Sequence, residues 1–302
     1  MSDLRYVMIT PARNEEENIG RLIESVVAQT LPPVKWVIVS DNSTDATDDI
    51  VQTYAEQHPF IHLVRRDEDG SRAFSSMAGA VSLGYERLQD LEFDMVAKMD
   101  ADMSMDSDCF ERLLAKCDAD PKVGRAGALL IQKTEQGMRN HLATPDYHVS
   151  GGLELFRRAC YEKMGGFQRP AYGGTDTIAD VMARMHGWKV QTFTDVNVVH
   201  HGRVGEYRGS IHWGRFYHGV QDYTLGYHPV FFLAKLVRRL KYWPYGMASF
   251  QQGAGYVYAC LRRFDCVVEP EVRAFIRNEQ KERLRESFRS LVLRDRSSAA
   301  TG

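Results

Sequence analysis

The sequence predicts an α/β fold in which a mostly parallel sheet is flanked by helices, with a helical extension toward the C-terminal end. In the first half, short β-branched runs alternate with stretches of helical periodicity, as expected for strand–helix repeats. The length of 302 residues suits one large α/β domain plus an extension. Beyond residue 205 the chain becomes dense in aromatic and basic residues. We therefore predict a domain at 1–205 and an extension at 206–302 whose last residues are disordered.

Each element follows from its local pattern. Apolar residues recur at helical spacing up to residue 29, and Pro32-Pro33 ends that helix. Helices are also expected around 50–55, at 75–88, 109–117 and 177–186, and, in a charged amphipathic form, at 269–293. Strands are expected at 6–9, 36–39, 61–64, 95–99, 126–131, 189–193 and 196–199.

Composition limits the class of protein. The formal net charge of −2 gives no reason to expect nucleic acid as a partner. Five cysteines without a C-x-x-C pair argue against a zinc site or a disulfide framework and fit a reducing compartment. The first ten residues lack the pattern of a signal peptide, and no apolar run approaches the roughly 20 residues of a membrane-spanning helix. The protein is therefore expected in the cytoplasm.

Polar loops follow four of the predicted strands, at 11–17, 41–45, 67–72 and 100–106, where ligands gather in open α/β sheets. The chain holds four Asp-x-Asp pairs, so the bare pattern carries little weight. Only Asp100/Asp102 directly follows an alternating apolar strand. Two carboxylates fixed at a strand end suit Mg²⁺ or Mn²⁺ and leave coordination sites for substrate phosphates. The alternative is a solvated turn.

Several motifs occur in order along the chain and together resemble family 2 glycosyltransferases of the GT-A fold, an inverting group that uses nucleotide-sugar donors. The resemblance covers roughly residues 5–205. The sequence stretches that carry it are Pro-Ala-Arg-Asn-Glu-Glu at 11–16, Ser-Val-Val-Ala-Gln-Thr at 25–30, Asp-Asn-Ser-Thr-Asp at 41–45, Asp-Ala-Asp at 100–102, Gly-Gly-Leu-Glu-Leu-Phe-Arg at 151–157, Gly-Gly-Thr-Asp at 173–176, Ala-Arg-Met-His-Gly-Trp at 183–188 and Val-His-His at 199–201.

The resemblance implies that Pro11, Glu15 and Asp41 line the nucleobase and ribose pocket of a UDP- or GDP-sugar and that Asp100 reaches the ribose. The family's usual Asp-Asp-Gly-Ser reads Ser-Asp-Asn-Ser at 40–43, which leaves the base of the nucleotide open.

The same resemblance implies that Asp102 ligates the metal that bridges the diphosphate. His200 or His201 gives a further contact, with His200 favoured because it lies at the strand end. Arg203 follows as a fixed cation for the phosphates.

Asp176 is implied as the catalytic base that takes the proton of the acceptor hydroxyl. Family members carry Glu before this Asp, where this chain has Thr175. Alternatively, Asp176 caps the helix that follows it. Asp180, one turn further along, is the second candidate for the base.

The implied activity is inverting, metal-dependent transfer of one sugar to an acceptor hydroxyl in the synthesis of a cell-envelope polysaccharide or glycolipid. The acceptor is a glycan or a lipid-linked saccharide. Residues 251–255 do not match the Gln-x-x-Arg-Trp motif of processive members, which favours a single transfer.

Residues 231–245 mix apolar, basic and aromatic side chains, including Lys235, Arg238 and Arg239. Such a segment could lie peripherally on the anionic inner face of a membrane, or it could be a core helix with solvated cations.

Other classes fit less well. A nucleotidyltransferase would carry a glycine-rich basic first loop, which 11–17 is not, and no G-x-G-x-x-G follows a strand as a dinucleotide-dependent oxidoreductase requires. A non-catalytic sugar- or nucleotide-binding homologue is the remaining alternative, because Ser40 and Thr175 depart from the family pattern.

Overall fold

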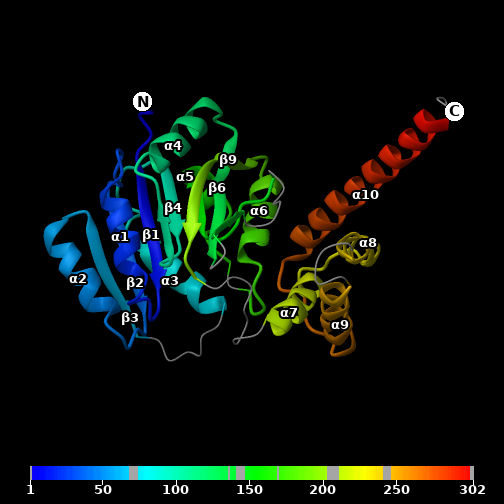
Figure 1. Cartoon of the computed structure of the whole chain (residues 1–302), viewed down its shortest axis with the longest axis horizontal. Coiled ribbons are helices and arrows are strands. Elements are labelled where there is room, and N and C mark those ends of the chain that lie inside the picture. The colour runs from blue at the N-terminus through cyan, green and yellow to red at the C-terminus, as the bar shows by residue number, and fades with distance from the viewer. Residues whose placement is uncertain are drawn as a thin grey trace. The chain divides into compact units, whose positions relative to one another are not determined.

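The computed structural model of the chain describes residues 2–67, 74–134, 137–140, 147–168, 170–202, 211–240 and 246–299. Contacts between residues divide the chain into two compact units, Met1–Val204 and Gly205–Gly302 (Figure 1). The first unit holds the sheet and the second is helical.

The sheet of the first unit has the strand order β3-β2-β1-β4-β8-β6-β9-β5, with β7 paired to β6. The strands β3, β2, β1 and β4 run parallel to one another, so their carboxyl ends share one edge of the sheet. The strand bounds are β1 Tyr6–Ala12, β2 Trp36–Asp41, β3 Ile61–Arg66, β4 Met95–Met99, β5 Met103–Met105, β6 Val123–Thr134, β7 Gly137–Asn140, β8 Leu153–Arg157 and β9 Lys189–His200.

Helices cover both faces of the sheet (Figure 1). Alternate strand residues point to opposite sides of a sheet, and here the apolar residues on each side pack against helices. In β1, Tyr6 and Met8 join a core with α1, α2 and α4, whereas Val7 and Ile9 join a second core with α3, α5 and α6. The helix bounds in this unit are α1 Ile19–Val27, α2 Thr47–Gln57, α3 Phe74–Glu86, α4 Cys109–Ala119, α5 Arg158–Lys163 and α6 Thr175–Met185.

The α/β class is as predicted, but the second half of the sheet is mixed. β8 lies antiparallel between β4 and β6, and β5 lies antiparallel beside β9. The two strands predicted at 189–193 and 196–199 form one strand, β9. The pairing of β9 with β6 shifts register after Phe193, and the exposed residues Thr194 and Asp195 lie in this irregularity. The apolar pattern of the sequence breaks at the same two residues.

The second unit contains α7 Ile211–Thr224, α8 Pro229–Arg239, α9 Met247–Leu261 and α10 Pro270–Ala299. Glycines allow α7 and α9 to cross closely. A Cβ on Gly219 would lie 1.9 Å from the Gln252 carbonyl oxygen, and a Cβ on Gly255 would lie 1.9 Å from that of Phe216. Within the described parts of the chain, no helix is both long and apolar enough to cross a membrane.

Candidate active site

The loops after β1 and β2 are joined by reciprocal hydrogen bonds. The backbone N–H of Glu15 donates to Thr47 Oγ1 at 2.8 Å, and that of Ala46 donates to Glu16 Oε2 at 3.0 Å. The N–H of Thr44 donates to Asn14 Oδ1 at 2.8 Å. Two polar loops that are far apart in the sequence therefore form one rigid rim at the sheet edge.

Asn42 explains one departure from the family pattern. Its φ is +56°, in the left-handed region that glycine and asparagine tolerate best. Asparagine therefore serves at the position where the family usually carries glycine, and the turn after β2 is kept.

Asp41 lies at the end of β2 and is only 5% exposed. Its Oδ1 accepts a hydrogen bond from Arg66 Nη1 at 2.9 Å, and its Oδ2 accepts one from the Ser76 hydroxyl. Carboxylate oxygens have further lone pairs, so these bonds leave capacity for a nucleobase N–H. Pro11 is half-buried at the end of β1, in register with Val39 of β2.

Asp100 and Asp102 follow β4 directly, as predicted. Asp100 Oδ1 lies 2.6 Å from Lys98 Nζ, and its backbone N–H donates to the Gly152 carbonyl at 2.9 Å. Asp102 Oδ2 lies 2.9 Å from His200 Nε2, which comes from the end of β9. The loop after β4 and the end of β9, which are far apart in the sequence, thus meet at this point.

Three carboxylates act electrostatically on the His200 ring. Burial by itself lowers the pKa of His200, but the hydrogen bond and charge of Asp102, then the charges of Asp100 and Glu15, raise it overall. Burial raises the pKa of Asp100, with a further contribution from Asp102, although Lys98 opposes both.

The adjacent histidines point to different partners. His201 Nε2 lies 2.7 Å from Ser104 Oγ, and its backbone N–H donates to the Asp102 carbonyl at 2.9 Å. His200 brings its Nε2 to the Asp102 carboxylate. Arg203 lies outside the described residues.

The donor set at this point fits a divalent cation that also binds phosphate. A carboxylate oxygen and an imidazole nitrogen converge from Asp102 and His200, and both suit Mn²⁺. Over the described ranges, no group of three or more His, Cys, Asp or Glu side chains could hold a metal. A metal held by this pair would therefore take its remaining ligands from a diphosphate and water.

Asp176 is the second residue of α6 and its side chain is 34% exposed. The expectation that it caps this helix is wrong, because Gly174, with φ +91°, takes the N-cap position. Two residues with positive φ, Gly173 and Gly174, turn the chain into the helix. Asp176 is therefore not the N-cap residue, although its Oδ1 accepts the first-turn N–H of Thr177 at 2.8 Å.

Asp180 is poorly placed to be the base. It is 2% exposed, and its carboxylate is held by Arg125 and His148. A carboxylate enclosed in this way cannot reach a sugar hydroxyl. The structure therefore leaves Asp176 as the carboxylate of α6 that a substrate could reach.

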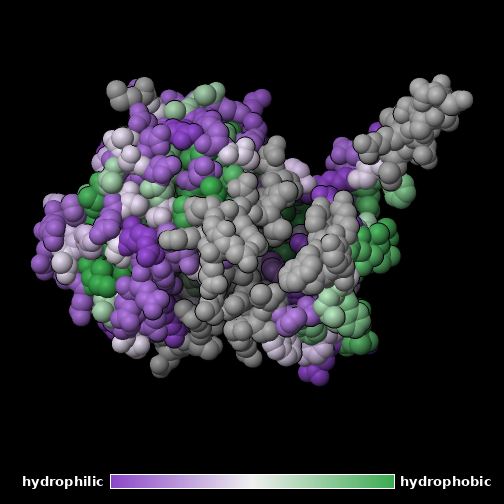
Figure 2. All heavy atoms as spheres, viewed as in Figure 1, coloured by the Kyte–Doolittle hydropathy of each residue, from purple (hydrophilic) through white to green (hydrophobic). Residues whose placement is uncertain are grey.

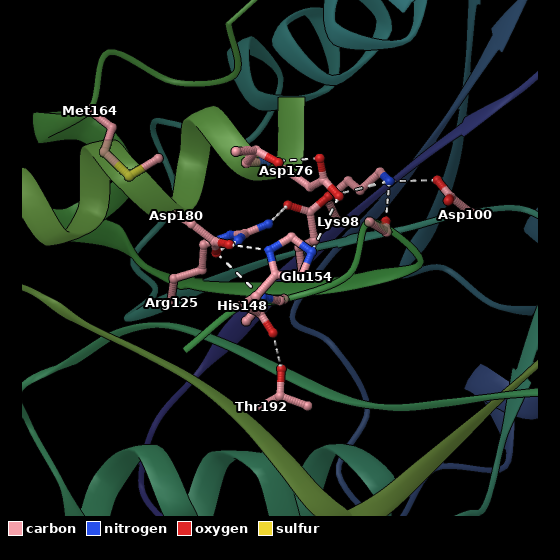
Figure 3. A network of polar contacts seen from close by, with 12 residues as sticks. Lys98, Asp100, Arg125, His148, Glu154, Met164, Asp176, Asp180 and Thr192 are labelled. Atoms are coloured by element: carbon pink, nitrogen blue, oxygen red, sulfur yellow. Dashed lines mark hydrogen bonds and ion pairs between the residues drawn. The ribbon is translucent and has the colours of Figure 1, made fainter. Parts of the chain in front are cut away.

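Sequence reasoning missed a buried network of charges that lies between Asp100 and α6 (Figure 3). Lys98, Arg125 and Glu154 are each at most 2% exposed. Lys98 Nζ contacts Asp100 and Glu154, and Arg125 contacts Glu154 and Asp180. Lysine, arginine and glutamate inside predicted strands were the signal, because such residues are buried only when they are paired.

The mixed sheet with helices on both faces is the arrangement expected of the GT-A fold, and the comparisons agree. The model of the family described as "Glycosyl transferase family 2" matches residues 7–168, more than half of the chain. The chain belongs to this family. Membership of this family rules out the two other enzyme classes considered from the sequence, a nucleotidyltransferase and a dinucleotide-dependent oxidoreductase.

Two curated relatives show what the chain is similar to. A β-monoglucosyldiacylglycerol synthase from Synechocystis sp. is 27% identical over 62% of this chain and 38% of its own length. An undecaprenyl-phosphate mannosyltransferase from Micrococcus luteus is 31% identical over 37% of this chain and 43% of its own. The matched part of the chain thus spans less than half the length of these relatives.

Solved structures support the fold. The mannosyltransferase PcManGT from Pyrobaculum calidifontis, in complex with GDP-Man and Mn²⁺, has a TM-score of 0.56 and 21% identity, covering 95% of this chain and 83% of its own. TarS residues 1–349 of S. aureus, in complex with UDP-GlcNAc, has a TM-score of 0.55 and 15% identity, covering 90% of this chain and 78% of its own.

Proposed function

We propose that this protein is an inverting, metal-dependent glycosyltransferase that moves one sugar from a UDP- or GDP-sugar to a hydroxyl of a lipid-linked saccharide or glycan during envelope synthesis. The observation that carries the proposal is the Asp102–His200 pair, 2.9 Å apart, at the end of β4 beside Asp100. The solved structures of the same fold in complex with GDP-Man and Mn²⁺ or with UDP-GlcNAc support the class of donor.

The donor lies along the carboxyl edge of the parallel strands. Pro11, Glu15 and Asp41 line the nucleobase and ribose pocket, and Asp100 reaches the ribose. Asp102 and His200 hold a divalent ion, Mn²⁺ or Mg²⁺, and Arg203 adds a positive charge at the phosphates. When bound, the ion stabilises the negative charge that gathers on the diphosphate.

Asp176 acts as the base. The acceptor oxygen attacks the anomeric carbon from the face opposite the diphosphate, and Asp176 takes the hydroxyl proton. The bond from the anomeric carbon to the diphosphate oxygen breaks, its electron pair leaves with the nucleoside diphosphate, and the configuration inverts. A base of this kind contributes a factor of about 10² to 10⁴ to the rate.

A thermal-shift screen of UDP-, GDP-, CDP- and dTDP-sugars with and without Mn²⁺ tests the donor site. At 100 times its dissociation constant a donor should add about 2.7 kcal/mol of stability. We expect one nucleotide class to act, only with Mn²⁺, and the effect to be lost in Asp102→Asn. Stabilisation that needs neither Mn²⁺ nor Asp102 would contradict the proposal.

Donor hydrolysis separates an active enzyme from a non-catalytic homologue. An active transferase is expected to release nucleoside diphosphate slowly without acceptor. Asp176→Asn should keep donor affinity and abolish transfer, whereas wild-type turnover in this variant would remove Asp176 from its role.

We also propose that α8 and α9 contact the cytoplasmic face of a membrane, which would bring the enzyme to a lipid-linked acceptor. Residues 229–264 contain six Lys or Arg and no Asp or Glu. Figure 2 shows hydrophobic residues gathered over α8 and α9. The large apolar side chains exposed on these helices are Val230, Leu233, Val237, Met247, Phe250, Val257, Tyr258 and Leu261.

The spacing of these residues favours a surface that binds at the interface between a membrane and water. Val230, Leu233 and Val237 fall on one face of α8, with Arg238 and Arg239 exposed at its end. Such a combination of apolar and basic residues suits an anionic bilayer. Lys235 does not take part, because its Nζ lies 2.8 Å from Asp222, a side chain that is only 6% exposed.

Flotation with vesicles tests this contact. The protein should float with phosphatidylglycerol–phosphatidylcholine vesicles more than with pure phosphatidylcholine, and high salt should weaken binding. Leu233→Glu with Val237→Glu should abolish flotation. Val34→Glu is the matched control, because Val34 is an exposed apolar residue (37%) of the first unit. Equal loss in both variants, or no preference for the anionic lipid, would refute the contact.

A further inference from the structure

His148 lies between the two carboxylates of α6 (Figure 3). Asp176 and Asp180 are one helical turn apart and therefore share a face of the helix. His148 Nδ1 contacts Asp180 Oδ2, and its Nε2 lies 3.7 Å from Asp176 Oδ2. One imidazole ring thus connects the accessible carboxylate with the buried one.

The ring is held through Asp180 and through the backbone of His148. Asp180 is held by Arg125, and its Oδ1 also accepts the N–H of Val149 at 3.4 Å. The backbone of His148 is fixed as well, because Thr192 Oγ1 donates to its carbonyl at 2.6 Å. An ion-paired carboxylate such as Asp180 can only accept, so Nδ1 carries a hydrogen and Nε2 is directed to Asp176.

The charges around the ring favour a second hydrogen, on Nε2. The groups of this network are Asp176 and Asp180 on α6, Arg125 on β6, Glu154 on β8, and Lys98 and Asp100 at β4 (Figure 3). Among the described residues, this network joins four carboxylates and two cations, and the Arg184 guanidinium of α6, which donates to the Tyr147 carbonyl at 3.1 Å, is a third cation nearby. A protonated imidazole reduces the imbalance and places its positive charge between two carboxylates, where it is most favourable.

We propose that His148 is the positioning residue of the base, and that it holds the Asp176 carboxylate aimed at the acceptor while Asp180 and Arg125 anchor the ring. This inference rests on the proposed role of Asp176. His148 touches neither donor nor acceptor in this assignment. It acts through the Asp176 carboxylate alone.

Two conservative variants separate this role from a structural one. His148→Gln keeps an N–H near the position of Nε2, toward Asp176, whereas His148→Asn keeps one near Nδ1, toward Asp180. Both remove the positive charge. We expect kcat of transfer to fall by about tenfold or more in His148→Asn and by less in His148→Gln, with the KM for the donor within about twofold of wild type in both.

The split between kcat and KM is the second measurement. Because the proposed role acts through the base alone, the loss should fall on kcat and leave the KM for the donor near its wild-type value. Equal losses of kcat and of melting temperature in the two variants, with a raised KM for the donor, would make His148 merely structural. Asp176→Asn is assayed in parallel. If it keeps turnover, the assignment of the base is wrong, whereas if it is inactive while both His148 variants behave as wild type, only the present inference fails.

Discussion

The absence of a side chain at Gly202 lets the chain pass directly over the Asp102 carboxylate. A Cβ at this position would lie 2.1 Å from Asp102 Oδ2 and 3.3 Å from His200 Nε2. The carboxylate would have to rotate away from the histidine, so the two candidate metal ligands would separate. Gly202→Ala should therefore weaken Mn²⁺-dependent donor binding by at least about tenfold, which corresponds to about 1.4 kcal/mol. Calorimetric titration of the donor in Mn²⁺ measures this.

Gly20→Ala is the matched control for this prediction. Its Cβ would meet only Ile50 Cγ2, at an ordinary 3.9 Å, so donor affinity should not change. Donor affinity of wild-type strength in Gly202→Ala would show that the pair formed by Asp102 and His200 does not hold the metal.

Single residues show where sequence reasoning succeeds and where it stops. Asp102 could be selected because it follows an apolar strand directly, and the structure brings it to His200. The partners of Asp41 could not be predicted, because Arg66 and Ser76 reach it only through the packing of β3 and α3. His148 belongs to none of the motifs, and its position between Asp176 and Asp180 depends on a loop that the sequence does not specify.

Among the elements, those with a strong hydrophobic periodicity could be predicted from the sequence, and those with a weak one could not. The first parallel strands and their helices follow from β-branched runs and 3.6-residue spacing. β8 was not predicted, because Leu153–Arg157 is short and follows paired glycines. Its antiparallel direction depends on long-range pairing with β4, which local patterns do not encode.

Arg125 joins three elements of the first unit. It lies on β6, is fully buried, and contacts Glu154 on β8 and Asp180 on α6. Arg125→Met would leave two carboxylates buried without this cation. We expect the free energy of unfolding to fall by about 3–5 kcal/mol, measured by urea denaturation of the full chain.

Arg112→Met is the comparison for the same method. Arg112 pairs with Asp108 and Asp195, but its side chain is 39% exposed, so less than about 1 kcal/mol should be lost. If the two variants unfold at the same urea concentration, the buried network does not hold β6, β8 and α6 together.

Across the whole molecule, the cysteines contribute to the packing of the core and not to disulfide bonds. All five are free thiols in the structure. Burial raises the pKa of the Cys109, Cys117 and Cys160 thiols to about 12, from an ordinary value of 9.0. Cys260, by contrast, is exposed. The three buried thiols lie on α4 and α5, which cover opposite faces of the sheet.

These thiols make stability depend on alkaline pH. In the unfolded chain they ionise near pH 9, whereas in the folded chain they keep their protons until about pH 12. Between these values the unfolded state binds fewer protons, so the free energy of unfolding falls as pH rises. Each thiol should cost roughly 1 kcal/mol between pH 9 and pH 10. Urea denaturation at pH 8, 9 and 10 measures the slope, which should decrease in Cys117→Ala and stay unchanged in Cys260→Ala. If Cys117→Ala keeps the full slope, the Cys117 thiol ionises in the folded protein and the core around it admits water.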